Sequence, residues 1–244
     1  MWKGKTAGDE ILIANYNSKN RTVTDGHLTE IFSMVGHRYG YDDVKAEFSA
    51  LRDFKVRWQR SYKWAIFTVS DYLDRAPDDV LENLAEVLFS KITGQDAQYG
   101  DVFLNYVTDR QLTRTNRKDF LKRSRNLSKT SIGDYHDLND CVNRLRDQRL
   151  IPDDIECVLT WDNSGSEKAA GVSVLQGVVW VSKVLDQKGI PEYVLDYSVY
   201  HMMCYLMLGF NPGPDMEYDH RRLIAKHPMR YDAESWLNEH GLFL

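Results

Sequence analysis

Residues 191–228 read PEYVLDYSVYHMMCYLMLGFNPGPDMEYDHRRLIAKHP and have the pattern of one long, buried helix. Pro191 suits the first turn, because its fixed φ and missing N–H fit a helix start. Gly209, followed by Asn-Pro-Gly-Pro, is a stop signal. The apolar positions between these signals are Val194, Leu195, Val199, Met202, Met203, Leu206 and Met207. We therefore expect a helix over residues 191–209, around which the rest of the chain is organised.

The middle of this helix carries side chains of the kind that bind metals. His201 lies at the centre of the apolar face, and Cys204 and Tyr205 follow three and four residues later, one turn along the same side. A zinc site built on a helix has its ligands at such positions. Each residue also has a simpler interpretation. His201 fits a core histidine hydrogen-bonded to Tyr205 or His220, and Cys204 fits a small buried hydrophobic side chain.

The composition limits the partners and the compartment. The chain has 244 residues, 43% hydrophobic and 27% charged, enough for one sizeable core or two small ones. Its net charge of -5 argues against electrostatic binding of nucleic acid or anionic membrane by the protein as a whole. No stretch reaches the ~18 apolar residues of a membrane span, and the N-terminus lacks the apolar core of a signal peptide. The three cysteines form no CxxC pair, so we expect a cytoplasmic protein that does not enter a membrane.

Residues 1–109 predict an N-terminal α+β module. Residues 1–26 predict at most one strand. Residues 54–58 alternate apolar and basic side chains, residues 64–69 are rich in β-branched and aromatic ones, and together they predict a β-hairpin. Apolar residues at helical spacing predict helices over 27–39, 41–51 and 74–91, and residues 101–106 extend the last helix or begin another.

Residues 110–132 form a connector in which basic residues predominate. Between 110 and 129 the only acidic residue is Asp119. One interpretation is a nucleic-acid patch in which Arg117, Lys118, Lys122 and Arg123 contact phosphates. The other is a solvated linker and helix face, which the acidic overall charge favours.

Residues 133–244 predict a second α+β module. A helix over 134–150 precedes three strands, over 157–161, 171–175 and 178–182, which we expect to form a small antiparallel sheet. The long helix follows, and two short helices over 218–226 and 233–240 complete the module. A small sheet packed on helices places the fold in the α+β class.

Several phrases of this second module resemble the SprT-like zincin metallopeptidases, in particular a prokaryotic branch of short proteins. The phrases are GDYHDLNDCVNRL (133–145), CVLTW (157–161), AAGVS (169–173), VVWVSKVLD (178–186) and IPEYVLDYSVYHMM (190–203). His220 stands where that family has its third zinc ligand, and His-Pro at 227–228 and Trp-Leu at 236–237 follow it. The resemblance implies a zincin-like fold for the second module, and the hairpin and helix upstream look like the N-terminal part of the same branch.

The HExxH motif of that family is altered in this chain. In HExxH the two His residues bind zinc from one helical face and the Glu is the general base. Here the motif reads His201-Met202-Met203-Cys204-Tyr205. Met202 replaces the Glu, and a thioether cannot accept a proton. Tyr205 replaces the second His, and a phenol is a poor zinc ligand at neutral pH. No catalytic residue is therefore expected, and a rearranged zinc site of His201, Cys204 and His220 is the alternative.

These observations lead to three hypotheses about function. The first is a degenerate metallopeptidase homologue, a pseudoenzyme without a cofactor that keeps the fold to bind a protein partner or for a structural role. The second is a metal-dependent hydrolase with zinc at His201, Cys204 and His220. The third is a nucleic-acid-associated protein that uses the basic connector, by analogy with the DNA-linked roles of some SprT-like relatives.

Overall fold

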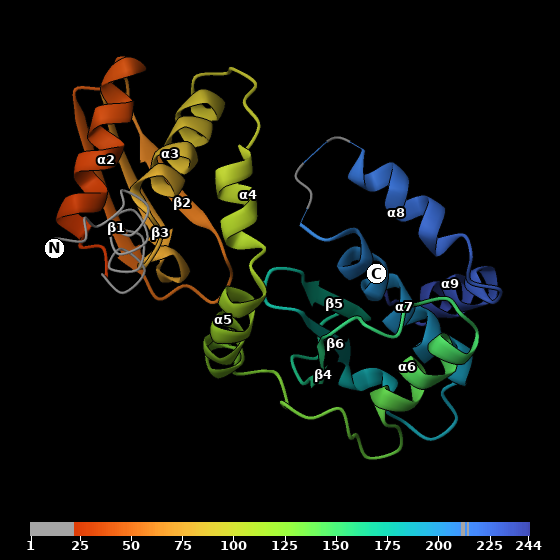
Figure 1. Cartoon of the computed structure of the whole chain (residues 1–244). Helices are drawn as coiled ribbons and strands as arrows, with labels where there is room; N and C mark the ends of the chain where they lie inside the picture. Colours follow the sequence, from red (N-terminus) through yellow and green to blue (C-terminus); the bar gives the residue numbers. More distant parts are fainter. Residues whose placement is uncertain (1–21, 211–212, 214) are drawn as a thin grey trace, which may run out of the picture. The chain divides into compact units, whose positions relative to one another are not determined.

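The computed structural model describes residues 22–210, 213 and 215–244. The chain divides into two compact units, Met1–Val107 and Thr108–Leu244 (Figure 1). In the described residues, each unit combines helices with a three-stranded sheet, which confirms the α+β class. The strand predicted within residues 1–26 falls mostly outside the described residues. None of the helices in the described ranges has both the length and the apolar character that a membrane crossing requires.

The first unit is built on a mixed sheet with strand order β1-β3-β2. Strands β2 and β3 pair antiparallel, which confirms the predicted hairpin, and β1 pairs parallel with β3. Residues 101–107 form a helix separate from the one before it. The elements of the unit are α2 (Asp25–Arg38), β1 (Asp43–Ser49), β2 (Val56–Arg60), β3 (Trp64–Ser70), the 3₁₀ turn η1 (Asp71–Leu73), α3 (Asp78–Ile92) and α4 (Asp101–Val107).

Strand β1 overturns the helix predicted over residues 41–51. Its side chains alternate, with Val44 and Ala46 buried while Asp43, Lys45 and Glu47 are exposed. This period of two fits a strand with one face on the core, and β1 supplies one edge of the sheet. The acidic residues near its start resemble a helix start signal, and this resemblance is why the sequence predicts a helix here.

The core of the first unit is a cluster of aromatic rings between α2, α3 and the sheet. Phe67 of β3 lies 5.0 Å from Phe32 of α2 and 5.1 Å from Phe89 of α3, measured between ring centroids. A Cβ atom at Gly36 would lie only 2.8 Å from atoms of Phe89 and Val44. A glycine at this position therefore lets α2 pack closely against both its neighbours.

The second unit contains the long helix and a second mixed sheet. The helices predicted over 134–150, 191–209, 218–226 and 233–240 are all present, with shifted ends. The elements are α5 (Arg110–Arg123), α6 (Leu138–Asp147), β4 (Val158–Asp162), β5 (Ala170–Ser173), β6 (Val178–Ser182), the 3₁₀ turn η2 (Lys183–Leu185), α7 (Glu192–Leu208), α8 (Met216–Ile224) and α9 (Arg230–Glu239).

The sheet of the second unit has the order β4-β6-β5, and the expectation of an all-antiparallel sheet was wrong. Strands β5 and β6 pair antiparallel through a tight turn, as expected for neighbours in sequence. Strand β4 pairs parallel with β6, so β6 is the central strand and β4 and β5 are its two edges. The long polar loop after β4 carries the chain to the far edge of the sheet before β6 fills the middle.

Helix α7 lies in the middle of the second unit and confirms the predicted long helix. It begins after Pro191 and ends at Gly209, whose φ of 70° suits a glycine. It contacts α6, α8 and α9 as well as β5 and β6 (Figure 1). Its buried residues are Val194, Leu195, Asp196, Tyr197, Ser198, Val199, Tyr200, Met202, Met203 and Cys204. Because these residues cover most of the helix circumference, side chains at its centre are removed from solvent.

Candidate functional site

The three positions that correspond to the expected zinc ligands lie together in space. His201 and Tyr205 are one turn apart on α7, and His220 comes from α8. The ring centroids of His201 and His220 are 4.6 Å apart, and those of His201 and Tyr205 are 6.1 Å apart. The rings of Tyr205 and His220 stack at 3.7 Å. We call His201, Tyr205 and His220 the ring cluster.

A hydrogen bond inside the ring cluster fixes the tautomer of His220. Its Nε2 atom lies 3.1 Å from the backbone carbonyl oxygen of His201. Because a carbonyl oxygen only accepts, Nε2 must carry the proton and donate it. A nitrogen that carries a proton has no lone pair for a metal. His201 Nδ1 is buried and has no hydrogen-bond partner among the described residues.

Burial also sets the protonation states of the ring cluster. Burial, assisted by neighbouring His220, lowers the pKa of His201 to about 4. Burial likewise lowers the pKa of His220. It raises the pKa of the Tyr205 phenol, as does the nearby Glu217. At neutral pH the ring cluster is therefore an uncharged group of two imidazoles and a phenol.

Cys204 does not complete a metal site with the two histidines. It is fully buried, and burial raises the pKa of its thiol to about 12 even though the Tyr200 hydroxyl acts in the opposite direction. A zinc ligand must be a thiolate. In the described part of the chain, no group of three or more His, Cys, Asp or Glu side chains is placed to hold a metal ion. As they are placed, the described side chains at the predicted site do not converge as a set of zinc ligands. Met202 is buried in the core.

A second layer of polar and aromatic side chains surrounds the ring cluster. The Tyr197 hydroxyl donates to Glu234 Oε1 at 2.5 Å, and Arg230 donates to the same oxygen at 2.9 Å. His227 packs against the rings of Tyr197 and Tyr200, at 5.3 and 5.4 Å. Both nitrogens of His227 are buried without a hydrogen-bond partner in the described residues. In the sequence, His227 is recognisable only as part of a His-Pro phrase. Its burial could not be predicted, because tertiary packing sets it.

The basic connector folds as helix α5, and one of its four predicted phosphate ligands is engaged elsewhere. The Arg117 side chain is only 12% exposed, and its Nε donates to the carbonyl oxygen of Gln176 at 2.7 Å. It therefore fastens α5 to the turn before β6. Lys118 and Lys122 are exposed and Arg123 is partly buried. The phosphate-contact interpretation thus loses Arg117.

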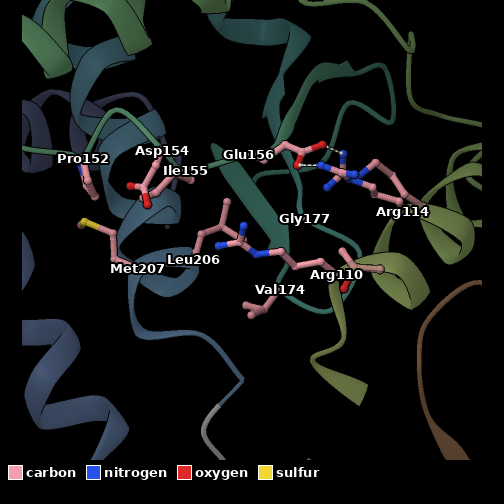
Figure 2. Close-up of a pocket in the computed structure, with 12 residues that line it drawn as sticks. Arg110, Arg114, Pro152, Asp154, Ile155, Glu156, Val174, Gly177, Leu206 and Met207 are labelled. Atoms are coloured by element: carbon pink, nitrogen blue, oxygen red, sulfur yellow. Dashed lines mark hydrogen bonds and ion pairs between the residues drawn. The ribbon is translucent and has the colours of Figure 1, made fainter. Parts of the chain in front are cut away.

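Helix α5 also forms one wall of a pocket of about 500 Å³ (Figure 2). Arg110, Arg114 and Arg117 line it from α5, Leu206 and Met207 line it from the end of α7, and residues 152–156 and the turn at Gly177 complete it. Sequence reasoning recognised the arginines as a cluster. It could not place them opposite the apolar end of α7, because the two segments are far apart in the chain.

Comparison of the chain with protein-family models, with curated proteins and with solved structures gives no match. Membership of the SprT-like family therefore stays a prediction that rests on the sequence phrases.

Proposed function

We propose that this protein is a non-catalytic relative of the SprT-like zinc metallopeptidases, of the prokaryotic branch, that keeps the fold for binding or for a structural role. One observation carries the proposal. The residues at the three expected ligand positions lie together, yet they form a stacked and hydrogen-bonded ring cluster instead of converging on a metal. This arrangement is what remains of a zinc site when its second histidine becomes an aromatic ring that packs against the third.

The chemistry of the substituted residues supports the same conclusion. Metal-assisted peptide hydrolysis needs three ligands, an open position for water and a base to deprotonate that water. Met202 offers a buried thioether where the base would be, and Tyr205 keeps its proton because its pKa is raised. Loss of a general base typically lowers a rate by ~100- to 10,000-fold.

We also propose that the protein resides in the cytoplasm. Cys141, Cys157 and Cys204 are all free, and burial raises the pKa of each thiol. Unpaired cysteines of this kind suit a reducing compartment.

The proposal is tested by measuring bound metal and peptidase activity in the purified protein. We expect no stoichiometric zinc, and no chelator-sensitive cleavage of an unfolded protein substrate. The rearranged site of His201, Cys204 and His220 makes the opposite prediction. One zinc per chain that is lost in His201→Ala and kept in the control His37→Ala, together with chelator-sensitive cleavage, would contradict the proposal and establish the metal enzyme. His37 is exposed in the first unit.

A further inference from the structure

The arginine-lined pocket of Figure 2 contains two engaged guanidinium groups and one without a partner. Arg114 donates to Glu156 at 2.8 Å, and Arg117 lies 3.6 Å from the other oxygen of the same carboxylate. Arg110 has no hydrogen bond or ion pair with any described residue. Figure 2 shows its side chain extended into the pocket, toward the end of α7. Arg110 can therefore accept an anion without breaking an existing interaction.

The wall behind Arg110 is held in place by fixed contacts. The guanidinium of Arg117 lies over the turn at Gly177, which has a φ of 59°. A Cβ atom at Gly177 would lie 2.7 Å from Arg117 Nη2 and 3.3 Å from the carbonyl oxygen of Glu156. A glycine suits both this backbone conformation and the close approach of Arg117. Arg117, which also donates to the carbonyl oxygen of Gln176, thus holds this turn against α5 and fixes one wall of the pocket.

The charges and the lining together restrict the ligand. The three arginines share the pocket with two carboxylates, Asp154 and Glu156, which leaves a net single positive charge among the lining side chains. A singly charged anion balances it, whereas the second charge of a phosphate monoester would remain uncompensated. Apart from the hydroxyl of Thr113, the other lining side chains are apolar: Pro152, Ile155, Val174, Leu206 and Met207. A ligand that fills the pocket must therefore pair one negative charge with an apolar group.

We propose that this pocket binds a small monocarboxylate that carries an apolar group. The carboxylate pairs with Arg110, because the guanidinium fork matches a carboxylate in a bidentate, charge-assisted arrangement. The apolar group packs against Leu206 and Met207. The volume of about 500 Å³ lies in the range of small-molecule sites. No residue of the ring cluster lines the pocket, so this inference stands or falls independently of the proposed function.

The experiment is a calorimetric titration of the whole chain with phenylacetate and with phenylacetamide, its uncharged counterpart of the same shape. We expect saturable binding of phenylacetate with a Kd on the order of 1 mM and much weaker binding of the amide. Arg110→Gln should weaken binding by about tenfold or more, because it removes a charge-assisted pair. Lys118→Gln removes an exposed charge from the same helix and should leave the Kd unchanged.

Three results would overturn the inference. The first is equal binding of acid and amide, or no saturable binding of either. The second is an unchanged Kd in Arg110→Gln. The third is competition by inorganic phosphate at concentrations as low as those of phenylacetate, which would identify a general anion site.

Discussion

His220 and His227 are buried and His201 is largely buried among aromatic rings, and this burial makes the protein sensitive to acid. Burial lowers the pKa of all three, so the folded state keeps them neutral where an unfolded chain would protonate them. When the pKa of a base is lower in the folded state than in the unfolded chain, the folded state loses stability as pH falls through the pKa of the unfolded chain. For His201 the window runs from the ordinary histidine pKa of 6.5 down to about 4.

The substitution His201→Phe tests this linkage. It keeps a ring and removes the titration, so the free energy of unfolding should fall less steeply between pH 6.5 and pH 4. The slope should change by up to ~1.4 kcal/mol per pH unit, less to the extent that water reaches the partly exposed ring. Urea unfolding at a series of pH values measures it. Tyr205→Phe, which keeps the stack and both histidines, should retain the wild-type slope; the same slope in His201→Phe would refute this origin.

At the scale of residues, identities could be read from the sequence but partners could not. That Met202 and Tyr205 occupy the positions of a base and a ligand is a prediction from the resemblance to the HExxH motif, read along one helix. His220 Nε2 donates to the carbonyl oxygen of His201 because α8 packs against α7. No local sequence pattern between the two helices predicts this packing.

Helices α6 and α7 are joined by an ion pair that closes one side of the core. Arg144 of α6 holds Asp196 of α7 in a fork, with Nη2 at 2.6 Å and Nε at 2.9 Å from the two carboxylate oxygens. The Asp196 side chain is only 8% exposed, whereas Arg144 is 32% exposed. Such a buried carboxylate depends on its partner, because water cannot replace the lost charge.

Removing one partner of this pair should therefore lower the free energy of unfolding far more than removing both. We expect Arg144→Leu to lower the free energy of unfolding by about 3 kcal/mol, and Arg144→Leu/Asp196→Leu to recover to within about 1 kcal/mol of the wild type. Glu192→Gln, at an exposed carboxylate 3.8 Å from Arg144, should change it by less than about 0.5 kcal/mol. Urea unfolding followed by tryptophan fluorescence, to which buried Trp161 contributes, measures each value. Additive losses in the double variant would contradict a buried, interdependent pair.

At the scale of elements, prediction succeeded where local signals agreed with each other. Helix α7 has a proline start, a glycine stop and a continuous apolar pattern, and the structure has the same element. Strand β1 carried two conflicting signals, acidic residues suited to a helix start and an alternation suited to a strand, and its partner β3 decided the outcome. The parallel pairing of β4 with β6 could not be predicted, because strand patterns show which face is buried but not which edges meet.

At the scale of the whole chain, the composition of the basic segment does not reveal where that segment packs. Helix α5 belongs to the second compact unit, where Arg114 and Arg117 meet Glu156 and Gln176. Phe120 of the same helix is buried near Trp180. A segment that suggests a connector or a phosphate patch thus packs as part of the second unit. The sequence did not predict this packing, because the partners of the segment lie some forty to sixty residues further along the chain.

We propose that α7 and α8 carry the remains of a zinc site that two substitutions have disabled. Restoring the motif by Met202→Glu/Tyr205→His would place a histidine where Tyr205 now stacks on His220. Because His201, residue 205 and His220 already lie within 6.1 Å of one another, small movements should bring three imidazoles onto one ion. Met202→Glu/Tyr205→Phe is the matched control, since it restores the glutamate without the ligand.

The most direct test is the zinc content per chain of the purified Met202→Glu/Tyr205→His variant, measured beside the wild type and the control. We expect close to one zinc per chain in the restored variant, lost on His220→Ala, and none in the wild type or the control. A folded double variant that binds no zinc, or a wild type that already holds one equivalent, would contradict it.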